Sequence, residues 1–165
     1  MRETAARIGC AALGIPGAIV GVWAAFAPRA FYDDFPGLGQ QWVSADGPFN
    51  EHLVRDVGEL SLALALVALL AVVWLTPVTV RIAGIAWLVD GTLHLVYHLR
   101  HFDALPSDQR VASIASLALG PIVAVAVLFL SREMNSTGGM IAPSGPSSAS
   151  STSASTAPKA PSSSI

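Results

Sequence analysis

The feature that most constrains this chain is a series of long segments without charge. No residue from Leu60 to Leu75 is charged, and none from Val111 to Leu130. A helix needs about 20 mainly apolar residues to cross a hydrocarbon core about 30 Å thick. Segments that meet or approach this length are residues 5–27, 57–75, 79–99 and 110–131. The sequence therefore predicts an integral membrane protein with the lipid bilayer as its main partner.

The predicted fold is all-α, a four-helix transmembrane bundle formed by residues 1–133. Its helices are apolar on every face, which suits lipid and not a water-facing surface. Only 12% of the residues are charged, against roughly 25% in a typical soluble domain. Residues 134–165 are rich in Ser, Pro and Ala. Such a segment buries too little apolar surface to offset its ordering entropy, so it predicts a disordered tail.

The first hydrophobic segment has some features of a cleaved signal peptide. Arg2 and Arg7 form a basic start, and small residues precede Pro28. However, the apolar stretch from Ile8 to Ala27 is longer than a usual signal core of about 7–15 residues. We therefore predict that this helix is retained.

The connections predict how the helices follow one another. Thr76 and Pro77 form a tight turn, which makes the second and third helices antiparallel neighbours. Asn50 is a good N-cap for the second helix. The loop of residues 29–50 carries aromatic side chains suited to the membrane–water interface: Phe31, Tyr32, Phe35, Trp42 and Phe49. We predict that this loop caps the outer side of the bundle.

The basic residues are few and scattered, and the formal net charge is -2. This argues against a nucleic-acid partner, because phosphate recognition needs clustered Lys and Arg. Basic residues near membrane spans favour the cytoplasmic side. Arg2 and Arg7 before the first helix therefore indicate that both termini are cytoplasmic in a multi-pass protein of the cytoplasmic membrane.

Small residues recur four apart on the first and fourth predicted helices. This spacing lets two helix backbones approach closely inside a membrane. The pattern is explained by packing within the bundle, and it would also permit a homodimer. The residues concerned are Gly17, Gly21, Ala25, Ser116, Gly120 and Ala124.

Ionisable residues gather on two of the predicted spans. His52, Asp56 and Glu59 share one face of the second helix. On the third helix, successive four-residue steps carry Asp90, His94 and His98, with Tyr97 and His101 beside that stripe. If the two helices run antiparallel from the turn at Pro77, Asp56 comes level with His98, Glu59 with His94 and His52 with His101. Asp90 then lies deeper, near the bilayer centre.

Three interpretations of this cluster remain open. An ionisable group at the centre of a span costs at least about 2.5 kcal/mol, so these groups must pair, line water or bind something. They could form a polar network that only fixes helix packing. They could hold a transition metal or a haem, since imidazoles four apart with carboxylates behind them suit zinc, iron or copper. They could also form a proton or small-ligand pathway.

The functional hypothesis is a membrane protein of unknown activity that binds a metal or haem. The candidate ligands are His52, Asp56, His94 and His98. Glu59 and Asp90 would orient these ligands or move protons, Arg55 would hold a carboxylate or an anionic group, and Tyr97 and His101 lie beside them. The alternative is a structural or accessory membrane protein. No phosphate-binding Gly-rich loop, nucleophile elbow, HExxH or cysteine-based zinc motif is present, so no reaction class is indicated.

Three strings in the sequence carry a resemblance to a known group of proteins. They are FYDDFPG from Phe31, WVSADGPFNEHLVRDVG from Trp42 and HLVYHLRH from His94. With these strings, residues 5–131 resemble a family of small, uncharacterised bacterial membrane proteins with four spans. In outline the chain is also similar to the DoxX-like four-helix membrane proteins. The resemblance implies the four-span fold and a histidine-bearing third span, and it implies no activity.

Overall fold

The computed structural model describes residues 1–101, 103 and 105–138 of the chain. It is almost entirely helical in this part. The long helices are α1 (Arg2–Phe26), α3 (Glu51–Val73), α4 (Pro77–His101) and α5 (Ser107–Gly138). Each is long and apolar enough to cross a membrane. The predicted all-α bundle with four spans is therefore confirmed, and the chain is a multi-pass membrane protein.

The predicted helix limits differ from the observed ones mainly at the ends. Polar first turns extend α3 back to Glu51 and α5 back to Ser107. α5 also continues to Gly138, through the first five residues of the predicted tail. The rest of that tail, residues 139–165, lies outside the described residues.

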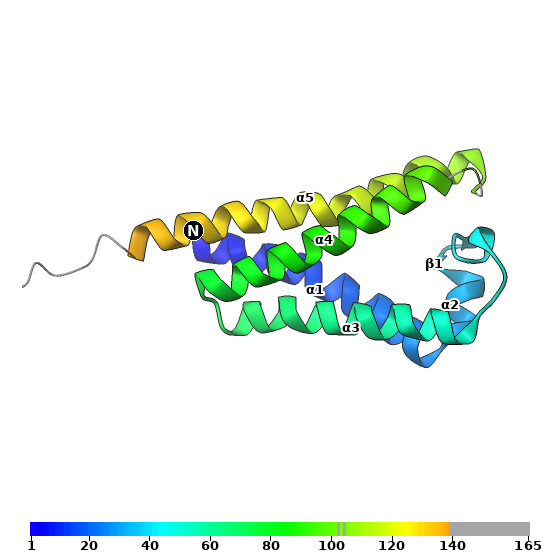
Figure 1. The fold of residues 1–165 in the computed structure, drawn as a ribbon, viewed down its shortest axis with the longest axis horizontal. Coiled ribbons are helices and arrows are strands. Elements are labelled where there is room, and N and C mark those ends of the chain that lie inside the picture. Colours follow the sequence, from blue (N-terminus) through cyan, green and yellow to red (C-terminus); the bar gives the residue numbers. More distant parts are fainter. Residues whose placement is uncertain (102, 104, 139–165) are drawn as a thin grey trace, which may run out of the picture.

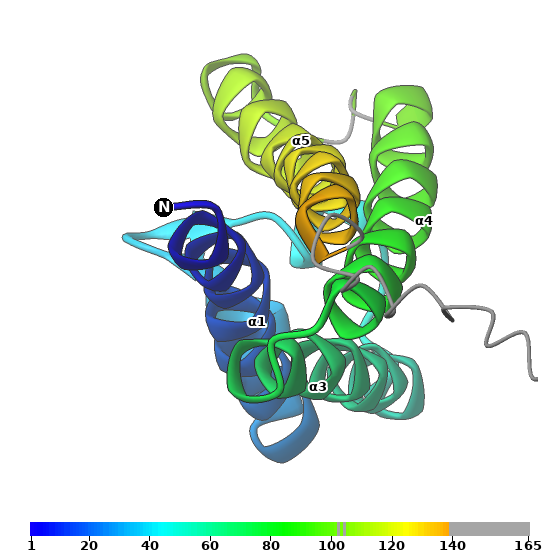
Figure 2. The same ribbon diagram turned by 90° about the vertical axis from the view of Figure 1, so that its left-hand side faces the viewer.

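The four long helices form two pairs (Figures 1 and 2). α1 packs most extensively on α3, and α4 packs on α5. The pairs lie close together at the end that holds the N-terminus, and they separate toward the other end (Figure 1). The side chains buried at the closed end are small or medium in size and come from all four helices, including Cys10, Ala68, Ala83 and Val127.

Glycines explain why α1 pairs with α3. A Cβ atom on Gly21 would lie 2.9 Å from the carbonyl oxygen of Gly58, and a Cβ on Gly58 would collide with the backbone nitrogen of Ala25. The two backbones are therefore in direct contact at this crossing, as small residues allow in a membrane. Gly17, Gly21 and Ala25 are all buried within the chain. The predicted small-residue face of α1 thus serves packing within the chain.

Close backbone approach also joins α4 to α5. A Cβ atom on Gly84 would lie 2.8 Å from the side chain of Leu128, and one on Gly91 would lie 2.9 Å from the ring of Pro121. Ala124, in the predicted small-residue stripe of α5, is fully buried here. Gly120 of the same stripe has no atom within 4 Å of an added Cβ.

Local capping places the turns where the sequence predicts them. The Asn50 side chain accepts a hydrogen bond from the Leu53 amide at 3.2 Å, which caps the start of α3. At the start of α4, Thr76 and Thr79 each accept a bond from the other's backbone amide at 3.1 Å. This reciprocal cap starts α4 directly after the turn from α3.

The segment between α1 and α3 is folded and lies in the wedge between the separated helix pairs (Figure 1). It contains α2 (Pro28–Asp34), a hairpin of β1 (Pro36–Gly37) and β2 (Gln40–Gln41), and a 3-10 turn (Ser44–Asp46). The hairpin turns through Leu38 and Gly39, both with positive φ, as a type I′ turn requires. The aromatic rings of this segment pack on one another, including Phe35 edge to face on Trp42 at 6.2 Å between centroids. The predicted aromatic loop therefore lies against one end of the bundle.

The two ends of the described chain meet on the opposite side. Nε of Arg2 lies 3.2 Å from Oε2 of Glu133, which ties the start of α1 to the last turns of α5. The Arg7 guanidinium also donates to the carbonyl of Val72 at the end of α3, at 2.9 Å. The start of α1 and the end of α5 are therefore on the same side of the membrane.

Candidate ligand cavity

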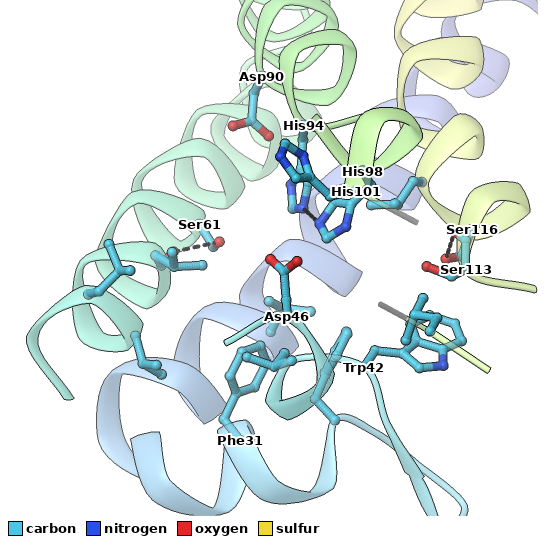
Figure 3. Close-up of a pocket in the computed structure, with 18 of the residues that line it drawn as sticks. Phe31, Trp42, Asp46, Ser61, Asp90, His94, His98, His101, Ser113 and Ser116 are labelled. Carbon is cyan, nitrogen blue, oxygen red and sulfur yellow. Dashed lines mark hydrogen bonds between the residues drawn. The ribbon is translucent and has the colours of Figure 1, made fainter. Parts of the chain in front are cut away.

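The wedge between the helix pairs holds a cavity of about 400 Å³ (Figure 3). All four long helices and the aromatic loop contribute to its wall. Pockets of about 300–1,000 Å³ with mainly apolar walls and a few polar groups are typical of small-molecule sites. This cavity has that composition: its polar residues are Asp46, Ser61, Asp90, His94, His98, His101, Ser113 and Ser116.

α4 supplies the ionisable side of the cavity, because helical spacing puts Asp90, His94, His98 and His101 along one face. The Nε2 atoms of His94 and His98 are 3.0 Å apart and share a hydrogen bond. Their rings stack with centroids 4.8 Å apart. The Nδ1 atom of His101 is 2.9 Å from the carbonyl oxygen of Tyr97, which holds that ring against its own helix.

Asp46 is the member of the site that sequence reasoning missed. It ends the 3-10 turn of the loop, and its carboxylate lies close enough to Tyr97 and His98 to act on both electrostatically. Figure 3 shows the imidazoles between the carboxylates of Asp90 and Asp46. In the sequence, Asp46 is distinguished only as an acidic residue in a loop between aromatic residues. Residue spacing does not predict that this loop reaches α4.

The opposite side of the cavity is apolar. Leu53, Val57 and Leu60 of α3 line it, and all three side chains are exposed within the described part of the chain. The aromatic loop contributes the rings of Phe31, Phe35 and Trp42. In the described part of the chain, Nε1 of Trp42 is a buried donor without a hydrogen-bond partner. The cavity therefore combines an aromatic floor, an aliphatic wall and an ionisable wall.

No arginine or lysine is among the described residues that line the cavity. Asp46 and Asp90 also form no ion pair with an arginine within the described chain. Arg110 has other partners: it donates to the carbonyl of Leu105 at 2.9 Å and lies 3.5 Å from Asp103. Within the described residues, the cavity carboxylates therefore have no arginine or lysine beside them, and Asp46 acts instead on Tyr97 and His98.

The predicted residues of α3 do not join this site. His52 pairs with Asp56 on its own helix at 3.5 Å, and its side chain is 88% exposed. Neither they nor Glu59 line the cavity. Arg55 donates to Glu51 at 3.0 Å and to the carbonyl of Ala25 on α1. Its partner is therefore the end of α1, not a ligand in the cavity.

The predicted register fails to bring the two groups together because α3 and α4 separate as they leave their shared turn. α3 packs along α1, which it contacts through glycine, and separates from α4 with distance from the turn that joins them (Figure 1). Among the described residues, no group of three or more His, Cys, Asp or Glu side chains could hold a metal ion. The predicted four-ligand metal site of His52, Asp56, His94 and His98 is therefore not assembled.

A network that fixes the packing of α3 on α4 is also not observed in the described part of the chain. The hydrogen bonds of His94, His98 and His101 are made within α4. Asp90 faces the cavity and not a neighbouring side chain of α3 (Figure 3). These groups line the cavity.

Comparisons with protein families, with curated proteins and with solved structures find no match for this chain. The resemblance to small four-span bacterial proteins and to the DoxX-like proteins therefore stays a prediction.

Proposed function

We propose that this membrane protein binds a small amphipathic molecule in the cavity between its two helix pairs. The observation that supports the proposal is the contrast between the walls of the cavity. One wall carries Asp90, His94 and His98, and the facing wall carries exposed aliphatic side chains of α3. A molecule with a polar head and an apolar body satisfies both walls at once.

The energetics of the bilayer favour this function. Ionisable groups inside a membrane are costly and are typical of substrate and ion pathways. Asp90 and His94 are exposed to the cavity in the described structure. Without an occupant or water, the Asp90 carboxylate would be an unsatisfied polar group in hydrocarbon, which costs several kcal/mol. Binding a polar head group offsets this cost.

The separation of α3 from α4 gives such a molecule a route from the bilayer. Leu60 is 66% exposed and Val57 41% exposed, although both line the cavity. The cavity is therefore open on this side. An amphipathic molecule dissolved in the membrane would enter between α3 and α4 without crossing the aromatic loop.

A substitution that fills the cavity tests the function. Val57→Trp places a large side chain in the cavity, and Leu66→Trp adds the same group at an exposed position on α3 outside the cavity. The purified proteins are heated with amphipathic molecules that carry cationic, neutral or anionic heads. A ligand at 100 times its Kd stabilises the folded state by about 2.7 kcal/mol. We expect this stabilisation in wild type and Leu66→Trp, and its loss in Val57→Trp. Equal stabilisation of all three proteins would overturn the proposal.

The metal hypothesis keeps one supporting observation. The Nε2 atoms of His94 and His98 converge at 3.0 Å, and two histidines four apart on a helix are a common part of metal sites. A metal there would need further ligands from water or from the bound molecule. Elemental analysis of wild type beside His94→Ala/His98→Ala decides this. Near-stoichiometric zinc, copper or iron that is lost in the variant would make the metal the occupant.

A further inference from the structure

We propose that the ligand of the cavity is an amphipathic organic cation, an ammonium group on an apolar body. This inference rests on the proposed function and names the chemistry of its ligand. Three features of the cavity support it: carboxylates with no arginine or lysine beside them among the described lining residues, two histidines joined by a hydrogen bond, and aromatic rings beside one of the carboxylates.

The carboxylates give the cavity a negative character. Asp46 lies on the loop side of the histidines, and Asp90 lies on the other side, one helical turn before His94 (Figure 3). No arginine or lysine among the described residues lines the cavity to neutralise them. A carboxylate in a low-dielectric site is stabilised in its charged form by a nearby cation. A ligand ammonium supplies that cation.

The hydrogen bond between His94 and His98 limits the positive charge that the protein itself brings. One Nε2 atom donates and the other accepts, so the accepting ring has an unprotonated nitrogen. The pair therefore carries at most one positive charge while this bond exists. With both rings neutral, the two carboxylates leave the cavity wall with a net negative charge. An anionic ligand would be repelled there.

The aromatic floor adds a second cation-binding element next to Asp46. The rings of Phe31, Phe35 and Trp42 line the cavity, with Phe31 and Phe35 4.7 Å apart between centroids. A cation over the face of an aromatic ring is attracted by the negative potential of that face, and aromatic cages recognise ammonium ligands in this way. Neutral or anionic head groups gain nothing comparable. Rings and carboxylate together thus favour an ammonium group.

Three probes that differ only in the head group test the proposal. They are 1-naphthylmethylamine, which is cationic near neutral pH, 1-naphthylmethanol, which is neutral, and 1-naphthoic acid, which is anionic. Binding to the full chain in phosphatidylcholine nanodiscs is measured by titration calorimetry, with empty nanodiscs as the blank. The pH is kept above the ordinary histidine pKa of about 6.5. We expect the amine to bind at least about tenfold more tightly than the alcohol, and the acid to bind most weakly.

Neutral variants of the carboxylates locate the binding site. Asp46→Asn and Asp90→Asn should each weaken amine binding about tenfold or more, because each removes a charge-assisted interaction. Binding of the alcohol should change by less than about threefold. The matched control is Asp34→Asn, an exposed carboxylate of α2 that does not line the cavity. It should leave binding of the amine unchanged.

The outcomes separate this inference from the proposed function. If the alcohol or the acid binds as tightly as the amine, and Val57→Trp abolishes that binding, the cavity is a ligand site but not a cation site. Amine binding that all three Asn variants weaken equally would reflect general surface charge and would also overturn the inference. If no probe binds above the empty-nanodisc blank, both the inference and the proposed function fail.

Discussion

His94 and His98, one turn apart on α4, share a hydrogen bond between their Nε2 atoms at 3.0 Å. The bond requires an unprotonated nitrogen on one ring, so it exists only while the pair carries no more than one proton in excess of the neutral state. Both rings face the cavity, where Asp46, Asp90 and His101 are the other ionisable groups. The protonation of this pair therefore decides how much positive charge an incoming ligand meets.

Binding of a cationic probe should weaken once the pH is low enough to protonate both imidazoles of the pair. Protonation of both imidazoles breaks their shared bond and adds positive charge beside the ligand cation. The measurement is the Kd of 1-naphthylmethylamine at several pH values. In His94→Gln/His98→Gln, which cannot gain this charge, the loss of affinity over the same range should be smaller. A pH profile that is unchanged in the double variant would show that the pair does not face the ligand.

The crossing of α1 and α3 should tolerate no side chain at Gly58. Its added Cβ would collide with the backbone of Ala25, which cannot move without separating the helices. We expect Gly58→Ala to lower the free energy of unfolding by about 1–3 kcal/mol, as overpacking usually does. The measurement is thermal unfolding in detergent followed by circular dichroism.

Gly120→Ala is the matched control for that substitution. Gly120 is also a helical glycine of a membrane span, and an added Cβ there has no atom within 4 Å. Alanine should leave stability unchanged or raise it by up to about 1 kcal/mol, through its better helix propensity. Equal destabilisation by both variants would mean that the backbones are not in contact at Gly58.

Arg55 should act on stability and not on ligand binding. Its guanidinium donates to the carbonyl of Ala25 near the end of α1, and it also pairs with Glu51. Arg55→Gln should cost about 1–3 kcal/mol, because it removes a charged donor from a partly buried carbonyl. Glu51→Gln keeps the bond to Ala25 and should cost at most about 1 kcal/mol, as exposed ion pairs do. Chemical denaturation checks both values, and a lower ligand affinity at unchanged stability would place Arg55 in the site instead.

Both ends of the described chain should be accessible to a labelling reagent only from the cytoplasmic side, and the aromatic loop only from the outer side. The salt bridge of Arg2 with Glu133 puts the two ends on one side, and the basic start of α1 favours the cytoplasm. After Cys10→Ala, a membrane-impermeant maleimide on intact cells should label Leu38→Cys in the hairpin and not Arg132→Cys. The reverse pattern would invert the orientation, and labelling of both would contradict the number of spans.

The site was only half predictable from the sequence, and the reason is local geometry. Residues four apart on a helix share a face whatever surrounds them, so the stripe of Asp90, His94 and His98 on α4 was predicted correctly. The partners of this stripe depend on the paths of other segments. Helix spacing predicted Asp56 beside His98, but the structure places Asp46 there, on a loop whose position no sequence spacing defines.

By itself, the sequence determined the four spans, their capped turns and the polar face of α4, since each depends on residues close together in the chain. Hydropathy sets the spans, Asn50 and Thr76 set the helix starts, and helical spacing sets the face. Only the tertiary structure decided that α3 pairs with α1. Gly58 contacts Ala25 because small residues on both helices let the two backbones approach closely. This contact favours packing of α3 on α1 over packing on α4, although a short turn joins α3 to α4. The cavity is the space that this choice of partner leaves open.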